Sequence, residues 1–239
     1  MRGTLHPITQ YLRRAIAVFK EMGFSVLDSP EVVTEQHNFD DLRIPKDHPA
    51  RRMQDTFWLT DGRLPRTHTS AHQIPAMKDQ KPPVRFVVPG RAFRNEATDA
   101  THETMFLNFE ALAIDKTGQI TLAHLKGTLH HFLSSMYGPN VGLKFVPSYF
   151  PFTEPSLEIY AQVRGRWIEM GGAGMVHPGV IKNMGLDPQK YQGFAFGVGI
   201  DRLVMLQHGI DDVRYFYSGN LRFLKQFVDP EPIQRGGKP

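Results

Sequence analysis

The chain has 239 residues, of which 41% are hydrophobic and 22% charged, with a formal net charge of +4 and no cysteine. This length and balance predict one soluble globular domain, and the lack of cysteine excludes disulfides and thiolate metal sites. No apolar run reaches the length of a membrane span and the first residues lack a signal-peptide core, so we expect a cytoplasmic protein. The mildly basic charge permits a nucleic-acid partner without requiring one.

The first predicted element is a helix over residues 7–22. Pro7 suits the first turn, apolar residues recur at helical spacing, and Gly23 ends the pattern. Residues 55–70 predict two short strands around an Asp-Gly turn, and residues 71–78 predict a helix that a proline interrupts.

The rest of the chain alternates strands and helices. A short apolar strand ends at residue 89 and leads into a charged hairpin over residues 90–112, which a long amphipathic helix follows over residues 120–137. The histidines of that helix have no carboxylate at ligand spacing, so we expect no metal site there. A second hairpin covers residues 157–170. Hairpins with helices between them predict an α+β fold, an antiparallel sheet flanked by helices.

The closing residues 229–239, DPEPIQRGGKP, are rich in proline, glycine and charge. This composition predicts a disordered tail. No repeat or internal linker stands out before it, so residues 1–228 are expected to form the single domain.

The hairpin over residues 90–112 places polar groups on one face of its second strand. Phe106, Asn108 and Glu110 alternate with apolar neighbours, so they share a side. Arginine binds phosphate or carboxylate oxygens, and an aromatic ring offers a stacking face to a nucleobase. A salt-bridged surface hairpin without a ligand fits the same spacing. The hairpin would bring this face close to Arg94, Glu96 and His102.

Residues 193–207, GFAFGVGIDRLVMLQ, predict a glycine-rich strand that runs into an amphipathic helix. The glycines would let a ligand approach the backbone closely. A dinucleotide-binding motif is excluded because Arg202 stands where that motif needs glycine. Arg202 lies in an otherwise apolar first turn, which favours a ligand role, although a solvated arginine is the ordinary alternative.

The motifs FRNE and GVGIDR, in this order and about a hundred residues apart, resemble motifs 2 and 3 of the class II aminoacyl-tRNA synthetases. Over about residues 6–227 the chain more specifically resembles the catalytic α subunits of bacterial-type phenylalanyl-tRNA synthetases, in the segments GRAFRNEATDATHETMF, PSYFPFTEPSLEI, EMGGAGMVHP, GFAFGVGIDRLVML and LRFLKQF. The resemblance implies the class II synthetase fold. It also implies activation of phenylalanine by ATP and Mg²⁺ to phenylalanyl-adenylate, followed by transfer to tRNA(Phe).

The resemblance also implies a set of ATP-binding residues. Arg94 and Arg202 match the catalytic arginines: Arg94 would bind the α-phosphate and the substrate carboxylate, and Arg202 the γ-phosphate. Phe106 and Arg202 would hold the adenine between them. Glu154 matches the family's Mg²⁺ position, to which a companion β subunit also contributes. The other implied ATP-binding residues are Glu96, His102 and Gly199.

A second implied set would bind the amino acid. His68 and Ser70 match positions that hold its polar end, and Glu110 matches one that takes its ammonium group. Phe150 and Phe152 alternate around a proline, which predicts two rings on one side of a strand, facing a phenyl substrate. Plain aromatic core packing is the alternative for these rings. The remaining members of the set are Asn108, Thr153, Ala195 and Gly197.

The chain departs from the family pattern in several places. Asn108 stands where glutamine is usual, so its hydrogen bond to the amino acid would be lost or carried by water. Arg52 replaces a usual aspartate, and Asp201 a usual glutamate. No heptads precede the first helix, where bacterial α subunits carry a tRNA-binding coiled coil, so we expect a truncated or naturally short form. The helix that starts at Pro7 matches motif 1, which predicts pairing with a β subunit or a homodimer.

Two other functions stay open. A paralogue that adenylates an amino acid for an acceptor other than tRNA would share the first step. A non-catalytic regulatory or binding paralogue would not need the charged groups for ATP, and the chain retains Arg94, Glu96, Glu154 and Arg202.

Overall fold

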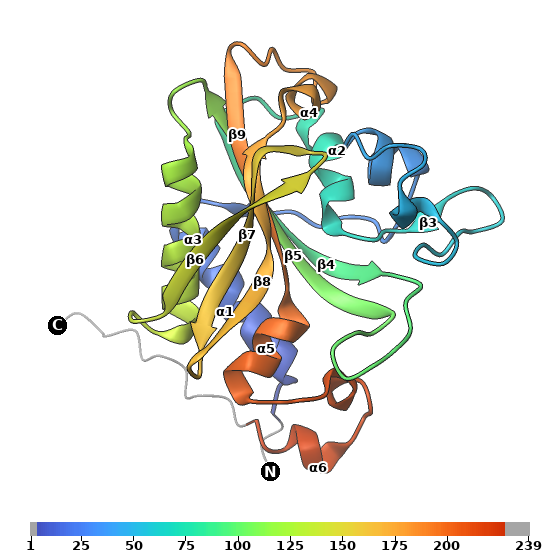
Figure 1. The fold of residues 1–239 in the computed structure, drawn as a ribbon, viewed down its shortest axis with the longest axis vertical. Coiled ribbons are helices and arrows are strands. Elements are labelled where there is room, and N and C mark those ends of the chain that lie inside the picture. Colours follow the sequence, from blue (N-terminus) through green and yellow to red (C-terminus); the bar gives the residue numbers. More distant parts are fainter. Residues whose placement is uncertain (1–3, 228–239) are drawn as a thin grey trace.

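The computed structural model describes residues 4–227. Their framework is a twisted sheet with helices packed on it (Figure 1). Within this range the sheet has seven strands, in the spatial order β1 (Ser25–Val26), β4 (Val84–Phe93), β5 (Met105–Lys116), β9 (Tyr191–Gly199), β8 (Arg166–Val176), β7 (Thr153–Val163) and β6 (Gly142–Phe150). The predicted tail at residues 229–239 lies outside the described residues.

The sheet is antiparallel, as predicted, except at one edge. The short strand β1 pairs with β4 in parallel, with Ser25 opposite Phe86. Parallel neighbours need a long connection between them, and residues 27–83 supply it. A strand of two residues gives no periodic signal, so the parallel edge could not be read from the sequence.

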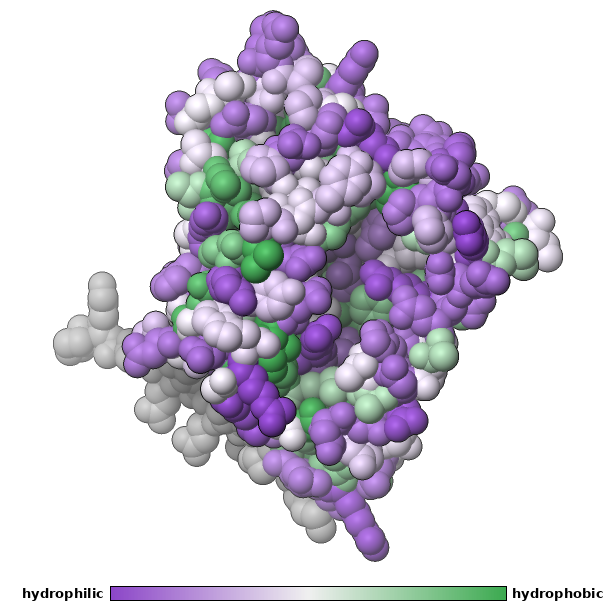
Figure 2. All heavy atoms as spheres, viewed as in Figure 1, coloured by the Kyte–Doolittle hydropathy of each residue, from purple (hydrophilic) through white to green (hydrophobic). Residues whose placement is uncertain are grey.

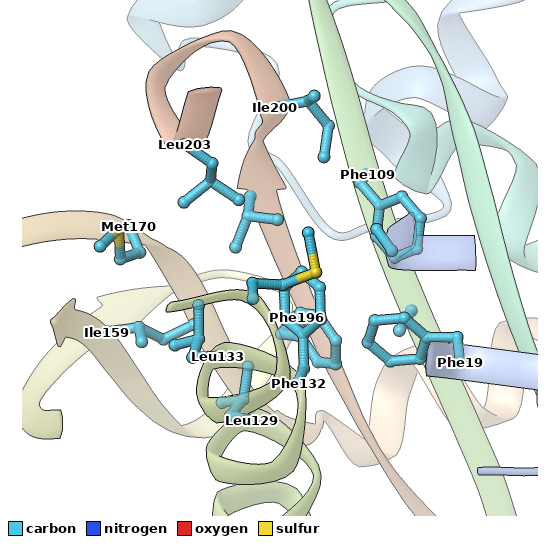
Figure 3. Packing of buried hydrophobic residues seen from close by; sticks show 14 of the residues in the cluster. Phe19, Phe109, Leu129, Phe132, Leu133, Ile159, Met170, Phe196, Ile200 and Leu203 are labelled. Atoms are coloured by element: carbon cyan, nitrogen blue, oxygen red, sulfur yellow. The ribbon is translucent and has the colours of Figure 1, made fainter. Parts of the chain in front are cut away.

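One face of the sheet is covered by α1 (Pro7–Glu21), α3 (Leu122–Tyr137) and α5 (Ile200–His208). Phe19 of α1 lies at the centre of this core, with its ring centroid 5.1 Å from that of Phe109 on β5 and 5.0 Å from that of Phe132 on α3. Figure 3 shows these rings near aliphatic side chains of α3 and α5, among them Leu133 and Leu203. The apolar sides of β5 and β9 therefore face the helices, which leaves their other sides free for a site.

A second core lies on the other face of the sheet and includes Phe39, Leu64 and Leu112. It is built from η1 (Gln36–Asp40), η2 (Pro49–Arg51), η3 (Thr69–His72), α2 (Gln73–Met77), α4 (Pro178–Asn183) and the small sheet of β2 (Val32–Val33) and β3 (Leu64–Pro65). Beyond α5 the chain continues through η4 (Val213–Phe216) and α6 (Leu221–Leu224).

Of the two strands predicted over residues 55–70, the one after the turn forms as β3 and the one before the turn does not; the turn itself is confirmed. The Gly62 amide donates to the Leu59 carbonyl at 3.1 Å, which closes the turn, yet β3 pairs with β2 and not with the segment before the turn. The segment before the turn keeps a backbone hydrogen bond across it, from the Leu59 amide to the Arg63 carbonyl at 2.9 Å. The Trp58 indole donates to the Arg51 carbonyl at 3.1 Å, and its ring packs 6.3 Å from that of Phe39. The partner of β3 is β2, which lies far earlier in the sequence.

The other predicted helices and hairpins are confirmed, except that the strand expected to end at residue 89 continues to Phe93 as β4. Helices occupy Pro7–Glu21 and Leu122–Tyr137, and β7 and β8 form the later hairpin with Gly165 at its turn, in the left-handed region with φ of 77°. Pro75 lies in the first turn of α2, where a missing backbone N–H costs little. No helix within residues 4–227 is both long enough and apolar enough to cross a bilayer.

Candidate active site

A cavity of about 470 Å³ opens on the sheet face opposite α1 and α3. Figure 2 shows the molecular surface hollowed near the centre of the view. The alternation of β5 explains the position, because Phe109 is buried in the helix-covered core while Phe106, Asn108 and Glu110 line the cavity. The charged hairpin, the glycine-rich strand β9 and the turn between β6 and β7 thus meet at one place.

Nearly all of the predicted site residues line this cavity. They are His68, Ser70, Arg94, Glu96, His102, Phe106, Asn108, Glu110, Phe150, Phe152, Thr153, Ala195, Gly197, Gly199 and Arg202. Glu154 does not line it. That residue is exposed on β7 beside Thr153, whose buried side chain faces the cavity. The structure therefore brings the predicted ATP and amino-acid residues together and leaves the predicted metal ligand outside.

Glu110 is a buried carboxyl group in the wall of the cavity. It is 6% exposed, the Ser70 hydroxyl donates to its Oε2, and Gln73 Nε2 donates to the same oxygen at 3.3 Å. Burial raises the pKa of the Glu110 carboxyl to about 7, against the opposing effect of the Ser70 hydrogen bonds. Gly197 lies opposite it on β9, and a Cβ there would lie 3.0 Å from Glu110 Cγ, so the glycine leaves room for the carboxylate.

His68 is a buried imidazole with unused hydrogen-bonding capacity. Neither ring nitrogen has a partner among residues 4–227. Burial, followed by the nearby charge of Arg94, lowers the pKa of His68 to about 3, so the ring is neutral at physiological pH. A neutral imidazole presents one donor and one acceptor. Because buried polar groups are normally paired, this ring fits a polar ligand in the cavity.

Asn108 is already paired with the protein. Its Oδ1 accepts hydrogen bonds from both the amide and the hydroxyl of Thr69, each at 2.9 Å, and its Nδ2 donates to the Val198 carbonyl at 3.4 Å. Thr69 lies between His68 and Ser70, so the amide fixes the segment that carries both. The shorter side chain therefore has an evident use in shaping the wall of the cavity.

The far end of the cavity is aromatic. The rings of Phe150 and Phe152 are stacked, with centroids 5.8 Å apart and planes 11° from parallel. Their common strand is a wrong prediction: Phe150 ends β6, and Phe152 lies in the turn to β7. The turn brings the rings together, and Gly172 makes room, because a Cβ there would lie 2.8 Å from the Phe150 ring. Thr153 and Ala195 are buried beside them, with 3% and 8% exposure.

The other end of the cavity carries exposed charges. The guanidinium of Arg94 lies over the Phe106 ring, 5.0 Å from its centroid, and 3.9 Å from Glu96. The His102 ring contacts Asp99 at 3.1 Å. Arg202 is exposed in the first turn of α5, next to the buried Asp201. Arg94 therefore covers one face of the Phe106 ring.

Some lining residues escaped the sequence reasoning. Gln73 follows Ser70 by one helical turn, a spacing that could have placed both beside Glu110. The adjacent glycines before Ala173 could have indicated a close approach to a strand. Nothing local marks Glu169, which β8 brings to the cavity edge. Tyr160 faces Glu169 across the strand pair, and its hydroxyl donates to Oε2 of Glu158 at 3.0 Å.

Comparisons with known proteins agree with this geometry. Residues 1–227 match the family described as tRNA synthetases class II core domain (F). Phenylalanine–tRNA ligase alpha subunits from Serratia proteamaculans and Yersinia enterocolitica are each 51% identical over 226 residues, covering 94% of this chain and 68% of theirs; that from Edwardsiella ictaluri is 50% identical over the same lengths. A solved pyrrolysyl-tRNA synthetase from Desulfitobacterium hafniense shares the fold, with a TM-score of 0.72 at 16% identity over 93% of this chain and 75% of that one. The chain therefore belongs to the class II aminoacyl-tRNA synthetase family.

Proposed function

We propose that this chain is the catalytic α subunit of a phenylalanine–tRNA ligase. It activates L-phenylalanine with ATP and transfers the phenylalanyl group to tRNA(Phe). The observation that carries the proposal is the polarity of one cavity: a stacked pair of phenylalanine rings at one end, Glu110 and His68 in the middle, and exposed arginines at the other. An amino acid with an aromatic side chain and a nucleotide would lie there end to end.

Recognition of phenylalanine follows from the buried part of the cavity. Glu110 would accept hydrogen bonds from the ammonium group of phenylalanine, while Ser70 and Gln73 hold the Glu110 carboxylate in place. The polar end of the amino acid would supply the partner that the ring nitrogens of His68 lack. The rings of Phe150 and Phe152 would contact the phenyl group, a type of contact worth about 0.5 to 1.5 kcal/mol beyond burial.

Activation requires no nucleophile from the protein. An oxygen of the phenylalanine carboxylate attacks the α-phosphorus of ATP, a new O–P bond forms, and pyrophosphate leaves with the electrons of the broken P–O bond. The chain would hold the two reactants in line and counter the phosphate charge. Arg94 would bind the α-phosphate and the carboxylate, Arg202 the γ-phosphate, and Phe106 the adenine. Glu96, His102 and Gly199 would complete the ATP site.

The family typically uses Mg²⁺ with its ATP, and the residues present fit a cation held mainly by phosphate. No group of three or more potential ligands is assembled within residues 4–227. Mg²⁺ usually keeps several waters and binds through one or two carboxylates together with substrate phosphates. Glu169 at the cavity edge suits that arrangement better than Glu154, which lies outside. The cation would supply charge neutralisation at the phosphates.

The proposal extends to partners. The relatives named above are alpha subunits, which supports a β subunit as the partner of this chain, and the helix that begins at Pro7 is the proposed contact. A homodimer through the same helix is the alternative. The acceptor of the phenylalanyl group would be tRNA(Phe).

The decisive experiment is phenylalanine-dependent exchange of pyrophosphate into ATP, by the chain alone and with a β subunit added. We expect exchange with phenylalanine well above that with tyrosine, and charging of tRNA(Phe) when the β subunit is present. Exchange without charging in the complex would favour an adenylating paralogue with another acceptor. A complex that exchanges nothing with phenylalanine would refute the proposal.

A further inference from the structure

The segment that follows α5 packs against the nucleotide end of the cavity, which Val213 of this segment helps to line. The Val213 amide donates to the Ala100 carbonyl at 2.8 Å, in the loop that carries Glu96 and His102. The Tyr217 hydroxyl donates to Oδ1 of Asp201. Figure 1 shows this segment beneath α5, beside the loop that joins β4 to β5. These contacts join the segment after α5 to the wall of the cavity where ATP would bind.

Asp201 takes the place of a missing strand partner. The ladder between β5 and β9 ends with Asn108 opposite Gly199, because the chain then turns into α5. The amide of Leu107 would be left without a partner on this side. Instead it donates to Oδ2 of Asp201 at 2.6 Å. A single carboxylate thus joins the first turn of α5 to the backbone of β5.

The residues next to this junction are the two that would hold the adenine. Leu107 follows Phe106, and Asp201 precedes Arg202. Phe106 and Arg202 come from different elements, so the distance between them depends on how α5 is fixed to β5. The link from Asp201 to Leu107 is the polar contact closest to both.

Asp201 depends on its hydrogen bonds because it is buried. It is 4% exposed, and it forms no ion pair within 4.0 Å in the described part of the chain. Burial raises the pKa of the Asp201 carboxyl, while the hydrogen bonds from Tyr217 and Leu107 oppose the rise. A buried carboxylate that loses a donor becomes costly to keep in place. The hydroxyl of Tyr217 is therefore a support for the whole junction.

We propose that Asp201 and Tyr217 are positioning residues for ATP, which together hold Phe106 and Arg202 at the separation that a stacked adenine requires. This inference rests on the proposed function, since it takes the nucleotide end of the cavity to bind ATP. Tyr217 acts by holding the Asp201 carboxylate. Asp201 acts on Arg202, the next residue in the chain, and on Phe106 through its hydrogen bond to Leu107.

Tyr217→Phe removes only the hydroxyl and tests the inference directly. In pyrophosphate exchange we expect the KM for ATP to rise about three- to tenfold, part of the loss typical of a hydrogen bond to a charged group, and the KM for phenylalanine to stay within about twofold. Tyr215→Phe is the matched control. Tyr215 lies in the same turn, is 46% exposed, and its hydroxyl makes no hydrogen bond in the described structure, so we expect no change.

Calorimetric titration with Mg-ATP, without an amino acid, separates this inference from the proposed function. A wild-type chain that binds ATP but exchanges nothing with phenylalanine would refute the function, while weaker ATP binding by Tyr217→Phe would still support the positioning role. A folded Tyr217→Phe chain with unchanged ATP affinity, or with both KM values raised equally, would overturn it. A wild-type chain that does not bind ATP would overturn both.

Asp201→Asn provides a second test, which stands even if Tyr217→Phe lowers the melting temperature too far for assay. The amide keeps the shape of the side chain and loses its charge, so ATP affinity should again fall by about three- to tenfold. The double variant should lose little more ATP affinity than the weaker-binding single variant, because both substitutions act on the hydrogen bond between Tyr217 and Asp201. Fully additive losses would contradict a shared route through Asp201.

Discussion

The two ends of the cavity are built on opposite principles. At the amino-acid end Glu110 is 6% exposed, its carboxylate is hydrogen-bonded, and the facing rings are already stacked. At the nucleotide end the side chains of Arg94 and His102 are 46% and 54% exposed. One end is complete in the folded chain; the other presents charged groups in water.

This difference indicates which contacts of the cavity are already formed when the chain folds, before any ligand binds. Buried polar groups are costly to leave unpaired, so the amino-acid end is pre-organised and the pKa of Glu110 is shifted upward. An exposed contact such as that between Arg94 and Glu96, at 3.9 Å, contributes about 0 to 1 kcal/mol. Arg94 can therefore leave Glu96 for a phosphate at little cost in ion-pair energy.

The strongest way to test the nucleotide end is Arg202→Ala. Loss of a charge that stabilises the transferring phosphate should lower the rate constant of exchange about 10²- to 10³-fold, while phenylalanine binding to the free chain stays nearly unchanged. Rapid-quench exchange and equilibrium dialysis measure the two effects. Arg85→Ala, an exposed arginine on β4 away from the cavity, is the control and should retain full activity. Equal losses in both variants would argue against a specific role.

Glu110→Gln tests the buried end. Replacing the carboxylate should raise the KM for phenylalanine about 10- to 100-fold, as expected for a lost hydrogen bond to a charged group, and leave the KM for ATP nearly unchanged. In the wild type the carboxylate is the binding form. Because its pKa is raised to about 7, protonation below that pH should raise the KM for phenylalanine, by about tenfold between pH 8 and pH 6. The variant should lack this pH dependence, and a retained dependence would assign it to another group.

The smallest expected effect concerns the size of the ring pocket. Ala195→Gly removes one methyl group beside the stacked rings and should raise kcat/KM for para-chlorophenylalanine about tenfold relative to phenylalanine, within the range known for one methylene in an apolar pocket. Ala161→Gly is the control, because it removes a methyl group from the helix-covered face of β7. It should reduce stability without changing specificity. No gain for the analogue would place the end of the pocket elsewhere.

Most of the framework was predictable from local patterns. The helix from Pro7, the long helix that ends at Tyr137, and the two-sided strand of Phe106, Asn108 and Glu110 all follow from periodicity within one element. The pairing around Gly62 was wrong because the strand after the turn, β3, pairs with Val32–Val33, far earlier in the chain. Predictions fail where the deciding partner is distant.

The same distinction divides the site. The motifs that carry the family resemblance supplied residues that the fold brings to one cavity, whereas other lining residues, such as Gln73 and Val213, were not predicted. Packing alone put Glu169 at the cavity edge and left Glu154 outside. Packing also placed Asn108 within hydrogen-bond distance of Thr69, and Tyr217 within hydrogen-bond distance of Asp201.

By itself the amino-acid sequence determined the helices, the strands and the residue types that face one side of each, since these depend on contacts between near neighbours in the chain. Only the tertiary structure decided how deeply each group is buried. Burial is the combined effect of elements far apart in sequence, and it sets the raised pKa of Glu110 and the neutrality of His68. Short sequence motifs therefore determine which functional groups line this cavity, while the assembled fold determines their burial and their pKa values.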